Sequence, residues 1–440
     1  MKKLSLPGIL IMSLLFGLPA VSGAGNWPQF QGPVPADVDL SRFPLKWSPE
    51  ENMQWTAEIA GYGQSSPVTW GERVFITSIS GPKKEHCHIA AFDLKAGKKL
   101  WQHDLESATQ GENSNYVSKA APTPVADAAG LVCFFEGGNL LALTHDGQVR
   151  WERNLVTQFG PIESRHGLSA SLEQSDDRVF VWVERSKDPY VLAIEKASGK
   201  EIWKSAGLGV TSWASPRLVP LQSGQHLVLS GIGALAGLDP MTGRQLWRFE
   251  GIKGNSTPTP APIGGGRFLI GATAGRGDAD AGKAAESNGL IAIKQRADGT
   301  FAADFVWKAK RATSSFGSPI AYQGLAYYVN AAGVLFCLDL ETGEERYSNR
   351  ISDSIWATPM PIGDRICFFG KSGTVSIVSA GPNFESLAEN ITWEATTPPQ
   401  DNSGGRSFGG SVLYATAFAN DRLLLRRGDK LYCVVVSSKR

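Results

Sequence analysis

A short phrase that returns along the chain constrains the fold more than any other feature. It reads GLDPMTGRQLW at residues 237–247, where Gly243 follows Asp239 by four residues and Trp247 follows Gly243 by four. A phrase that recurs at intervals of tens of residues indicates a repeat architecture. Full or shortened copies occur at 52–59, 91–101, 146–151, 193–203, 298–307, 337–347 and 389–393.

Each copy of the phrase predicts a β-hairpin. Alternating apolar residues form one strand, an Asp/Thr-Gly pair turns the chain, and a second strand follows with an aromatic residue facing inward. Glycine at the turn accepts a positive φ without steric cost. The aromatic residues are expected to cover apolar area between neighbouring units, a structural role. They are Trp55, Trp101, Trp151, Trp203, Trp247, Trp307, Tyr347 and Trp393.

The units around the phrase predict a propeller. Two further strand-like runs precede each phrase, as at 65–70 and 73–78, and four short strands in about 40 to 50 residues are typical of a propeller blade. The last unit, 409–436, has three strands, and segment 52–59 is expected to supply the fourth and close the ring. We therefore predict an all-β fold, a single eight-bladed β-propeller of four-stranded antiparallel blades over residues 52–440. A solenoid is the alternative, but it would need capping repeats.

The start of the chain resembles an export signal. Lys2 and Lys3 precede an apolar stretch that ends in small residues at Ala24. This pattern predicts a signal peptide at 1–24, an exported protein that is periplasmic or secreted, and no transmembrane segment after cleavage. A retained membrane anchor is the alternative, although Pro and Gly interrupt the short apolar run. Residues 25–51 would then form an N-terminal extension.

Composition argues against several classes of protein. The 43 basic and 42 acidic residues leave a net charge of +1, which gives no support to nucleic-acid binding. Five cysteines in an exported chain are unlike a disulfide scaffold. His86 and His88 flank Cys87, but strand alternation would place the thiol on the opposite face, so no metal site is predicted.

The repeated phrase resembles the pyrroloquinoline quinone (PQQ) repeat, and the resemblance extends from Asn26 to the C-terminus. The segment NWPQFQGP (26–33) is also similar to the N-terminus of exported bacterial PQQ-like propeller proteins, with Gln31 where arginine is usual. The PQQ-like family includes quinoprotein alcohol dehydrogenases and non-enzymatic relatives such as the outer-membrane barrel-assembly scaffold. The matching residues are structural, so the resemblance implies an eight-bladed propeller and leaves the activity open.

The dehydrogenases of this family hold PQQ between a tryptophan and a disulfide of two adjacent cysteines. No two cysteines are adjacent here, and the calcium-binding Glu and Asn and the catalytic Asp have no recognisable match. The chain therefore resembles the scaffold members more than the true dehydrogenases, and we predict no cofactor and assign no catalytic residue. A dehydrogenase for alcohols or sugars, with PQQ and calcium in an atypical site, is the alternative.

The loops that lead into the innermost strands are expected to gather at one mouth of the channel, where aromatic and cationic residues alternate. Such a mouth suits an anionic or planar partner. The predicted binding residues are Tyr62, Gln64, Lys119, Arg165, His166, Trp213, Asn255, Phe316, Trp356, Arg406 and Phe408. The alternative is that they are ordinary loop residues packed against adjoining blades.

The function expected from the sequence is that of a non-catalytic scaffold or binding protein. Its channel mouth would bind an envelope protein, a peptide or a glycan, and the protein is expected to be a monomer. An insertion at 274–289 should overhang the same mouth, without an assigned role.

Overall fold

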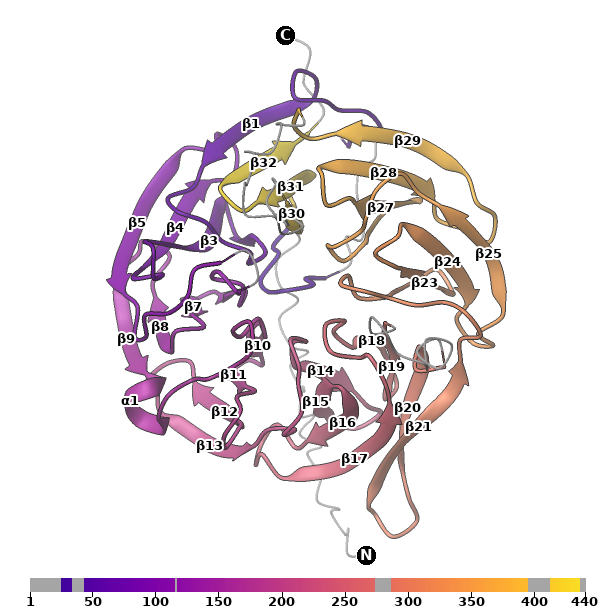
Figure 1. Ribbon diagram of the computed structural model, residues 1–440, viewed down its shortest axis with the longest axis horizontal. Helices are drawn as coiled ribbons and strands as arrows, with labels where there is room; N and C mark the ends of the chain where they lie inside the picture. The colour runs from indigo at the N-terminus through magenta and orange to yellow at the C-terminus, as the bar shows by residue number, and fades with distance from the viewer. Residues whose placement is uncertain (1–24, 34–42, 115–116, 274–285, 395–411, 436–440) are drawn as a thin grey trace, which may run out of the picture.

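The computed structural model describes residues 25–33, 43–114, 117–273, 286–394 and 412–435. In this part of the chain, eight four-stranded antiparallel sheets form a closed ring (Figure 1). The helix α1 (Leu155–Phe159) interrupts this all-β architecture for five residues. The predicted eight-bladed propeller is thus confirmed. The predicted signal peptide, most of the 274–289 insertion, and the site residues Arg406 and Phe408 lie outside the described residues.

The first four blades follow one another along the chain, each built from the innermost strand outward. Blade 1 consists of β2 (Val68–Trp70), β3 (Arg73–Ser80), β4 (His86–Asp93) and β5 (Lys99–Glu106). Blade 2 consists of β6 (Val125–Asp127), β7 (Gly130–Phe134), β8 (Asn139–Leu143) and β9 (Val149–Asn154). Blade 3 consists of β10 (Glu173–Gln174), β11 (Arg178–Val183), β12 (Tyr190–Glu195) and β13 (Glu201–Ala206). Blade 4 consists of β14 (Arg217–Pro220), β15 (Gln225–Gly231), β16 (Gly233–Leu238) and β17 (Gln245–Ile252).

The remaining blades repeat this order, with one exception in the last. Blade 5 consists of β18 (Ala261–Gly264), β19 (Arg267–Ile270), β20 (Gly289–Gln295) and β21 (Phe301–Lys308). Blade 6 consists of β22 (Ile320–Tyr322), β23 (Leu325–Val329), β24 (Val334–Asp339) and β25 (Glu345–Arg350). Blade 7 consists of β26 (Met360–Ile362), β27 (Arg365–Phe369), β28 (Thr374–Ser379) and β29 (Ser386–Ile391). Blade 8 consists of β30 (Leu413–Ala419), β31 (Arg422–Arg427), β32 (Lys430–Val434) and, from the start of the chain, β1 (Met53–Glu58).

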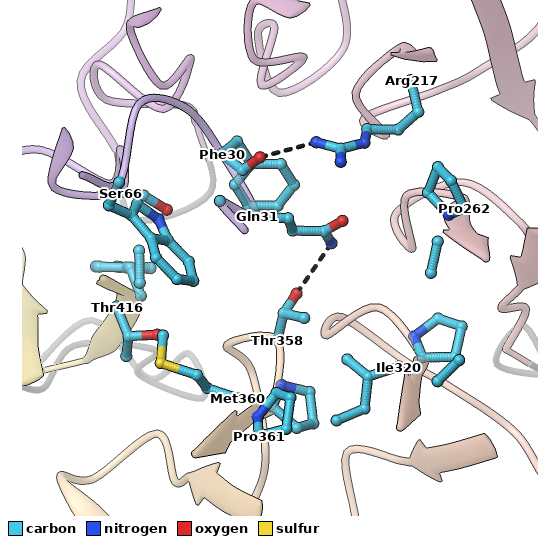
Figure 2. A pocket seen from close by; sticks show the side chains of 18 residues that line it. Phe30, Gln31, Ser66, Arg217, Pro262, Ile320, Thr358, Met360, Pro361 and Thr416 are labelled. Carbon is cyan, nitrogen blue, oxygen red and sulfur yellow. Dashed lines mark hydrogen bonds between the residues drawn. The ribbon is translucent and has the colours of Figure 1, made fainter. Parts of the chain in front are cut away.

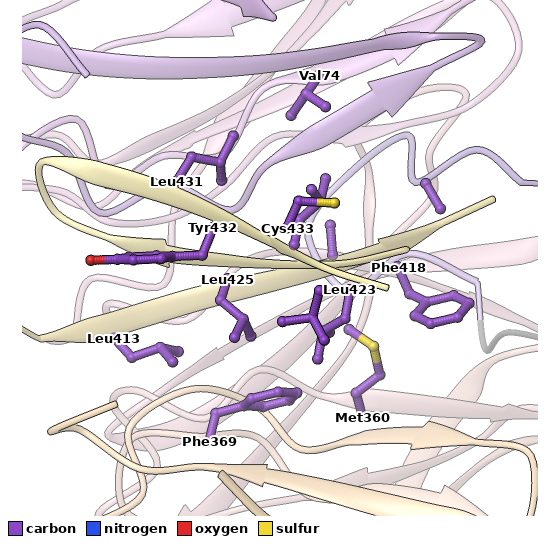
Figure 3. Close-up of a cluster of buried hydrophobic side chains, with 14 of the residues drawn as sticks. Val74, Met360, Phe369, Leu413, Phe418, Leu423, Leu425, Leu431, Tyr432 and Cys433 are labelled. Carbon is purple, nitrogen blue, oxygen red and sulfur yellow. The ribbon is translucent and has the colours of Figure 1, made fainter. Parts of the chain in front are cut away.

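Blade 8 closes the ring as the sequence predicts. Strand β1 pairs antiparallel with β32, and Trp55 lies opposite Cys433. Apolar side chains of this blade, among them Leu425 and Leu431, belong to one buried cluster with Val74 of blade 1 and Phe369 of blade 7 (Figure 3). The two ends of the chain therefore share one sheet, in which β1 covers the edge of β32 and completes the four strands of the blade.

Antiparallel order gives the ring two different faces. The turns between first and second strands and between third and fourth strands lie on one face, which we call the turn face. The loops between second and third strands, and the loops that lead from one blade into the next, lie on the opposite face, which we call the mouth face. Each strand runs between the two faces, so residues near opposite ends of a strand serve different faces.

On the turn face, five indoles tie neighbouring blades together. In each case the Nε1–H donates to a carbonyl oxygen in the turn between the third and fourth strands of the next blade, at 2.8–3.1 Å. The pairs are Trp55 with Leu94, Trp101 with His145, Trp151 with Lys196, Trp203 with Pro240 and Trp307 with Leu340. The repeated phrase thus joins one blade's tryptophan to the next blade's turn.

In five of the phrases, the turn glycine lies directly against the preceding blade's indole. Gly199 has a φ of +73°, and a Cβ placed on it would lie 2.6 Å from Trp151 Cδ2. Gly97, Gly147, Gly243 and Gly343 make the same approach to Trp55, Trp101, Trp203 and Trp307. Glycine is needed here for two reasons, the positive φ and the absence of a side chain.

Three of the eight aromatic ends behave differently. Trp247 donates to His226 Nδ1 in its own blade at 3.0 Å, because the hairpin of blade 5 continues past the level of the other turns. Tyr347 packs edge-on against Phe384. Trp393 lies just beyond the end of β29, and Ala388 occupies the repeat position opposite Ile377. The aromatic residue counted from the sequence is therefore displaced toward the mouth face in blade 7.

A relay of hydroxyl groups joins the starts of seven innermost strands. The backbone N–H of one blade's Ser or Thr donates to the hydroxyl oxygen of the corresponding Ser or Thr in the next blade, at 2.9–3.2 Å. The sequence of this relay is Ser66, Thr123, Ser171, Ser215, Thr259, Ser318 and Thr358. A proline follows six of these seven residues, so the positions of the relay can be recognised in the sequence as Ser-Pro and Thr-Pro pairs.

Candidate functional site at the channel mouth

The channel is occupied from the turn face by residues 25–33, which we call the plug segment. The Asn26 side chain accepts from the N–H of Gly71, in the turn between β2 and β3. Trp27 and Thr69 exchange two hydrogen bonds, and the carbonyl of Pro28 accepts from the N–H of Ala126. The plug thus pairs with the inner edges of β2 and β6, which would otherwise present unpaired N–H groups.

Further along, the plug reaches the opposite side of the ring. Gln29 donates to Glu173 at 2.9 Å, and Arg217 donates to the carbonyl of Phe30 at 2.9 Å. Burial raises the pKa of the Glu173 carboxyl, whereas the nearby Arg217 acts in the opposite direction. The sequence predicted only an extension here. The structure shows that residues 25–33 fill part of the channel, a role that the sequence did not indicate.

The mouth face holds a cleft of about 580 Å³ between the loops of blades 1, 2 and 3. Its lining includes Lys84, Glu136, Arg165 and His166, of which Arg165 and His166 were predicted as binding residues. Lys84 lies between β3 and β4, Glu136 lies between β7 and β8, and the adjacent Arg165 and His166 lie in the loop that leads from blade 2 into blade 3. We call this the cationic cleft.

The floor of the cationic cleft is a buried ion pair. Lys84 Nζ lies 3.5 Å from Glu136 Oε1, and both side chains are largely buried. Both carboxylate oxygens of Glu136 accept from the N–H of Ala120. Lys119, another predicted residue, donates from Nζ to the carbonyl of Ser114 beside the cleft at 2.6 Å. Burial, followed by repulsion from Lys84, lowers the pKa of Lys119.

Three residues around the cationic cleft have unusual backbone conformations. Lys84, Ala120 and His166 have φ values of +58°, +44° and +69°. Non-glycine residues in this region cost of order 1–3 kcal/mol each and gather at functional sites. Three such residues beside one cleft make this part of the mouth face the candidate functional site.

Aromatic side chains form a second feature of the mouth face, at blades 6 and 7. The rings of Phe316 and Trp356 lie 4.6 Å apart, and Lys371 Nζ lies 4.7 Å from the centre of the Trp356 ring. The Phe316 side chain is 41% exposed. An exposed aromatic residue beside a cation–π pair is an arrangement found where proteins bind planar or extended partners.

Other predicted mouth residues make contacts that hold neighbouring loops together. The Trp213 indole lies 6.0 Å from the His166 ring and donates to the carbonyl of Gly167. The Tyr62 hydroxyl bonds that of Tyr414 at 2.9 Å, and burial raises the pKa of Tyr62.

Two predicted residues hold backbone in place. Gln64 exchanges two hydrogen bonds with the backbone of Lys119. Asn255 is fully buried and bonds the backbone of Gly233 and the hydroxyl of Ser230. Asn255 therefore stabilises blade 4 and is not presented to a partner.

The described residues do not fit the quinone seat of the dehydrogenases. All five cysteines are buried free thiols and none is adjacent to another. No three His, Cys, Asp or Glu side chains within the described ranges form a group that could hold a metal ion. We therefore derive no redox step from this site.

The same part of the chain contains no helix long and apolar enough to cross a membrane.

Comparisons with known proteins agree with this architecture. BamB from Moraxella catarrhalis is similar in structure, with a TM-score of 0.58 and 15% identity over 88% of this chain and 98% of that one. Quinohemoprotein alcohol dehydrogenase from Comamonas testosteroni has a TM-score of 0.58 and 11% identity, over 96% of this chain and 82% of that one. At these identities the similarity shows the fold and not the activity.

Two comparisons rest on sequence. Polyvinylalcohol dehydrogenase from a Pseudomonas species is 22% identical over an alignment of 230 residues that covers 43% of this chain and 33% of that protein, so the chain spans about a third of that curated relative. A family model described as outer membrane protein assembly factor BamB matches residues 49–181 and 161–364. Because this match spans well over half of the sequence, the chain belongs to the PQQ-like repeat family of BamB.

Proposed function

We propose that this protein is an exported, non-catalytic binding or scaffold propeller that holds a protein, peptide or glycan partner at its mouth face. The observation that carries the proposal is the cationic cleft, where the exposed Arg165 and His166 lie beside a buried Lys84–Glu136 ion pair, and where Lys84, Ala120 and His166 have strained backbones. Binding residues are commonly held on loops by a rigid scaffold, and the propeller supplies such a scaffold.

The exposed Phe316 beside Trp356 supports the same proposal from the other side of the mouth. A partner that spanned both features would meet cations on one side and aromatic rings on the other. Membership of the BamB family is compatible with a protein partner, and the leader-like residues 1–24 favour export.

Site-specific photo-crosslinking tests where a partner binds. A crosslinking amino acid would replace Arg165 on the mouth face or Arg244 in an exposed turn of blade 4 on the opposite face. We expect an envelope partner to be captured from position 165 and not from position 244. Capture from 244 alone would place the binding surface on the wrong face.

A pair of substitutions tests the aromatic part of the mouth. Trp213→Ala with Trp356→Ala should reduce the captured partner at least about tenfold, equivalent to about 1.4 kcal/mol, while the melting profile changes little. A large fall in melting temperature would instead make these residues part of the core.

A catalytic role is tested on the same purified chain. Dye reduction with alcohols or aldose sugars that depends on added PQQ and Ca²⁺ would overturn the non-catalytic proposal in favour of a quinoprotein dehydrogenase. The double variant Trp213→Ala, Trp356→Ala then serves as the control for activity at the mouth.

A further inference from the structure

The plug segment fills only part of the channel. It pairs with the inner edges of blades 1 and 2, and a chamber of about 160 Å³ remains between it and the innermost strands of blades 4 to 8 (Figure 2). Plug residues Phe30, Gln31 and Gly32 form one side of the chamber. The chamber therefore exists only because the chain folds its own N-terminal segment into the ring, and it is separate from the cationic cleft.

The wall formed by blades 5 to 7 is apolar apart from Thr358, whereas blades 1 and 8 add the hydroxyl groups of Ser66, Tyr414 and Thr416. Pro262 of blade 5, Pro319 of blade 6, and Pro359 and Pro361 of blade 7 all line the chamber, together with Ile320. Proline has no backbone N–H, so these positions offer no main-chain donor. Proline and aliphatic side chains instead present a surface against which a flat apolar ring packs.

Blade 4 and the plug segment supply the chamber with one cation and one amide, from Arg217 and Gln31. Figure 2 shows Arg217 and Gln31 facing this space, with Arg217 bonded to the Phe30 carbonyl and Gln31 bonded to Thr358. Arg217 Nε lies 3.4 Å from the buried Glu173 carboxylate.

The backbone that places Gln31 is strained. Gln31 has a φ of +51°, a conformation that residues other than glycine adopt at a cost and that points to function. The plug is therefore held in a strained form that directs an amide into the chamber.

We propose that this chamber binds a small carboxylate that contains a single ring, with benzoate as the simplest example. The carboxylate would accept from Arg217 and from Gln31, and the ring would lie against the proline wall. The size is suitable, because an apolar cavity of about 150 Å³ in another protein holds benzene. This site does not depend on a partner at the mouth face, so the two proposals stand or fall separately.

Calorimetric titration of the full chain with sodium benzoate tests the proposal. We expect a single site with a dissociation constant below about 1 mM, and binding of the uncharged benzyl alcohol weaker by at least about tenfold. Absence of any binding up to about 10 mM benzoate would overturn the proposal, as would equal affinity for the two compounds.

Substitutions locate the site. Gln31→Glu adds a carboxylate that would compete for Arg217, and it should weaken benzoate binding at least about tenfold. The matched control is Gln295→Glu, at an exposed position on β20, which should bind benzoate as the unmodified chain does. Unchanged binding in the Gln31→Glu variant, or an equal loss in the control, would overturn the assignment.

A second variant separates the loss of the cation from the loss of folding. Arg217→Met is combined with Glu173→Gln, so that no unpaired carboxylate is left buried. This variant should lose the preference for benzoate and retain the weaker binding of benzyl alcohol to the proline wall. If the preference for benzoate persisted, the carboxylate would not bind at Arg217.

Discussion

The two faces of this propeller are built from the same repeated unit and yet differ in almost every respect. On the turn face, an indole, a carbonyl group and a glycine recur in the same arrangement between five pairs of blades. On the mouth face, the loops differ from blade to blade in length, charge and aromatic content. The repeated contacts of the turn face thus hold the blades together, whereas the variable loops of the mouth face carry the candidate functional site.

The largest expected effect lies in a contrast between two tryptophans at blades 3 and 4. Trp203 is buried on the turn face and bonds the Pro240 carbonyl, so Trp203→Ala should lower the free energy of unfolding by about 3–5 kcal/mol. Trp213 lies on the mouth face, and Trp213→Ala should lose less than half as much. Urea denaturation measures both values. Equal losses would remove the distinction between the faces.

Two glycines with the same backbone conformation allow the two faces to be compared more directly. Gly199 on the turn face and Gly209 on the mouth face both have a φ of +73°, but a Cβ on Gly199 meets the Trp151 ring whereas a Cβ on Gly209 meets nothing within 4 Å. Both alanine variants should lose about 1 kcal/mol from the positive φ. Gly199→Ala should lose about 1–3 kcal/mol more from overpacking. Thermal unfolding of the two variants at equal concentration tests this difference.

The hydroxyl relay provides a test of whether a repeated contact outside the turn face also stabilises the protein. Ser215→Ala would leave the buried N–H of Ser171 without its acceptor, at an expected loss of about 1–2 kcal/mol in the free energy of unfolding. Ser223→Ala, in the exposed turn between β14 and β15, is the control and should cost less than about 0.5 kcal/mol. A negligible effect at Ser215 would show that solvent or a relaxed backbone replaces the relay.

The smallest expected effect concerns Trp247, one of the three aromatic residues that do not bond the next blade's turn. The Trp247 indole donates to His226 Nδ1, so that nitrogen must be unprotonated, and burial lowers the pKa of His226 below its ordinary value of 6.5. The unfolded chain then binds more protons than the folded one as the pH falls below 6.5, and the free energy of unfolding should decrease there.

The substitution His226→Gln isolates this contribution. Glutamine retains an acceptor for the indole and does not titrate. Denaturation between neutral and mildly acidic pH should show a shallower slope in the variant. An unchanged slope would assign the pH dependence to other groups.

Much of the fold could be predicted from the sequence because its stabilising contacts recur. Eight units, four strands in each and the return of the first segment to the last blade all follow from a phrase with fixed spacing, and the structure confirms them. The assignment of Trp393 shows the limit of this reasoning. The shortened copy at 389–393 matches only by its aromatic end, and the register places Ala388 at the repeat position.

The candidate site was predicted less completely. Arg165 and His166 could be placed on the mouth face from strand order, but the cationic cleft also needs Lys84 and Glu136, which come from separate loops. These four residues approach one another only when the blades form a ring, and the loops that carry them do not belong to the repeated phrase. The position of the plug segment in the channel was not predicted for the same reason, because this segment has no repeated copy elsewhere in the chain.

The shared sheet of blade 8 has a consequence for how the molecule assembles. Gln54 and Cys433 are joined by a hydrogen bond although 379 residues separate them. Contacts between such distant residues slow folding, because the intervening chain must be ordered first. During synthesis β1 therefore stays unpaired until β32 has been made. In that interval its free edge is exposed to aggregation, and chaperones that bind nascent chains would protect it.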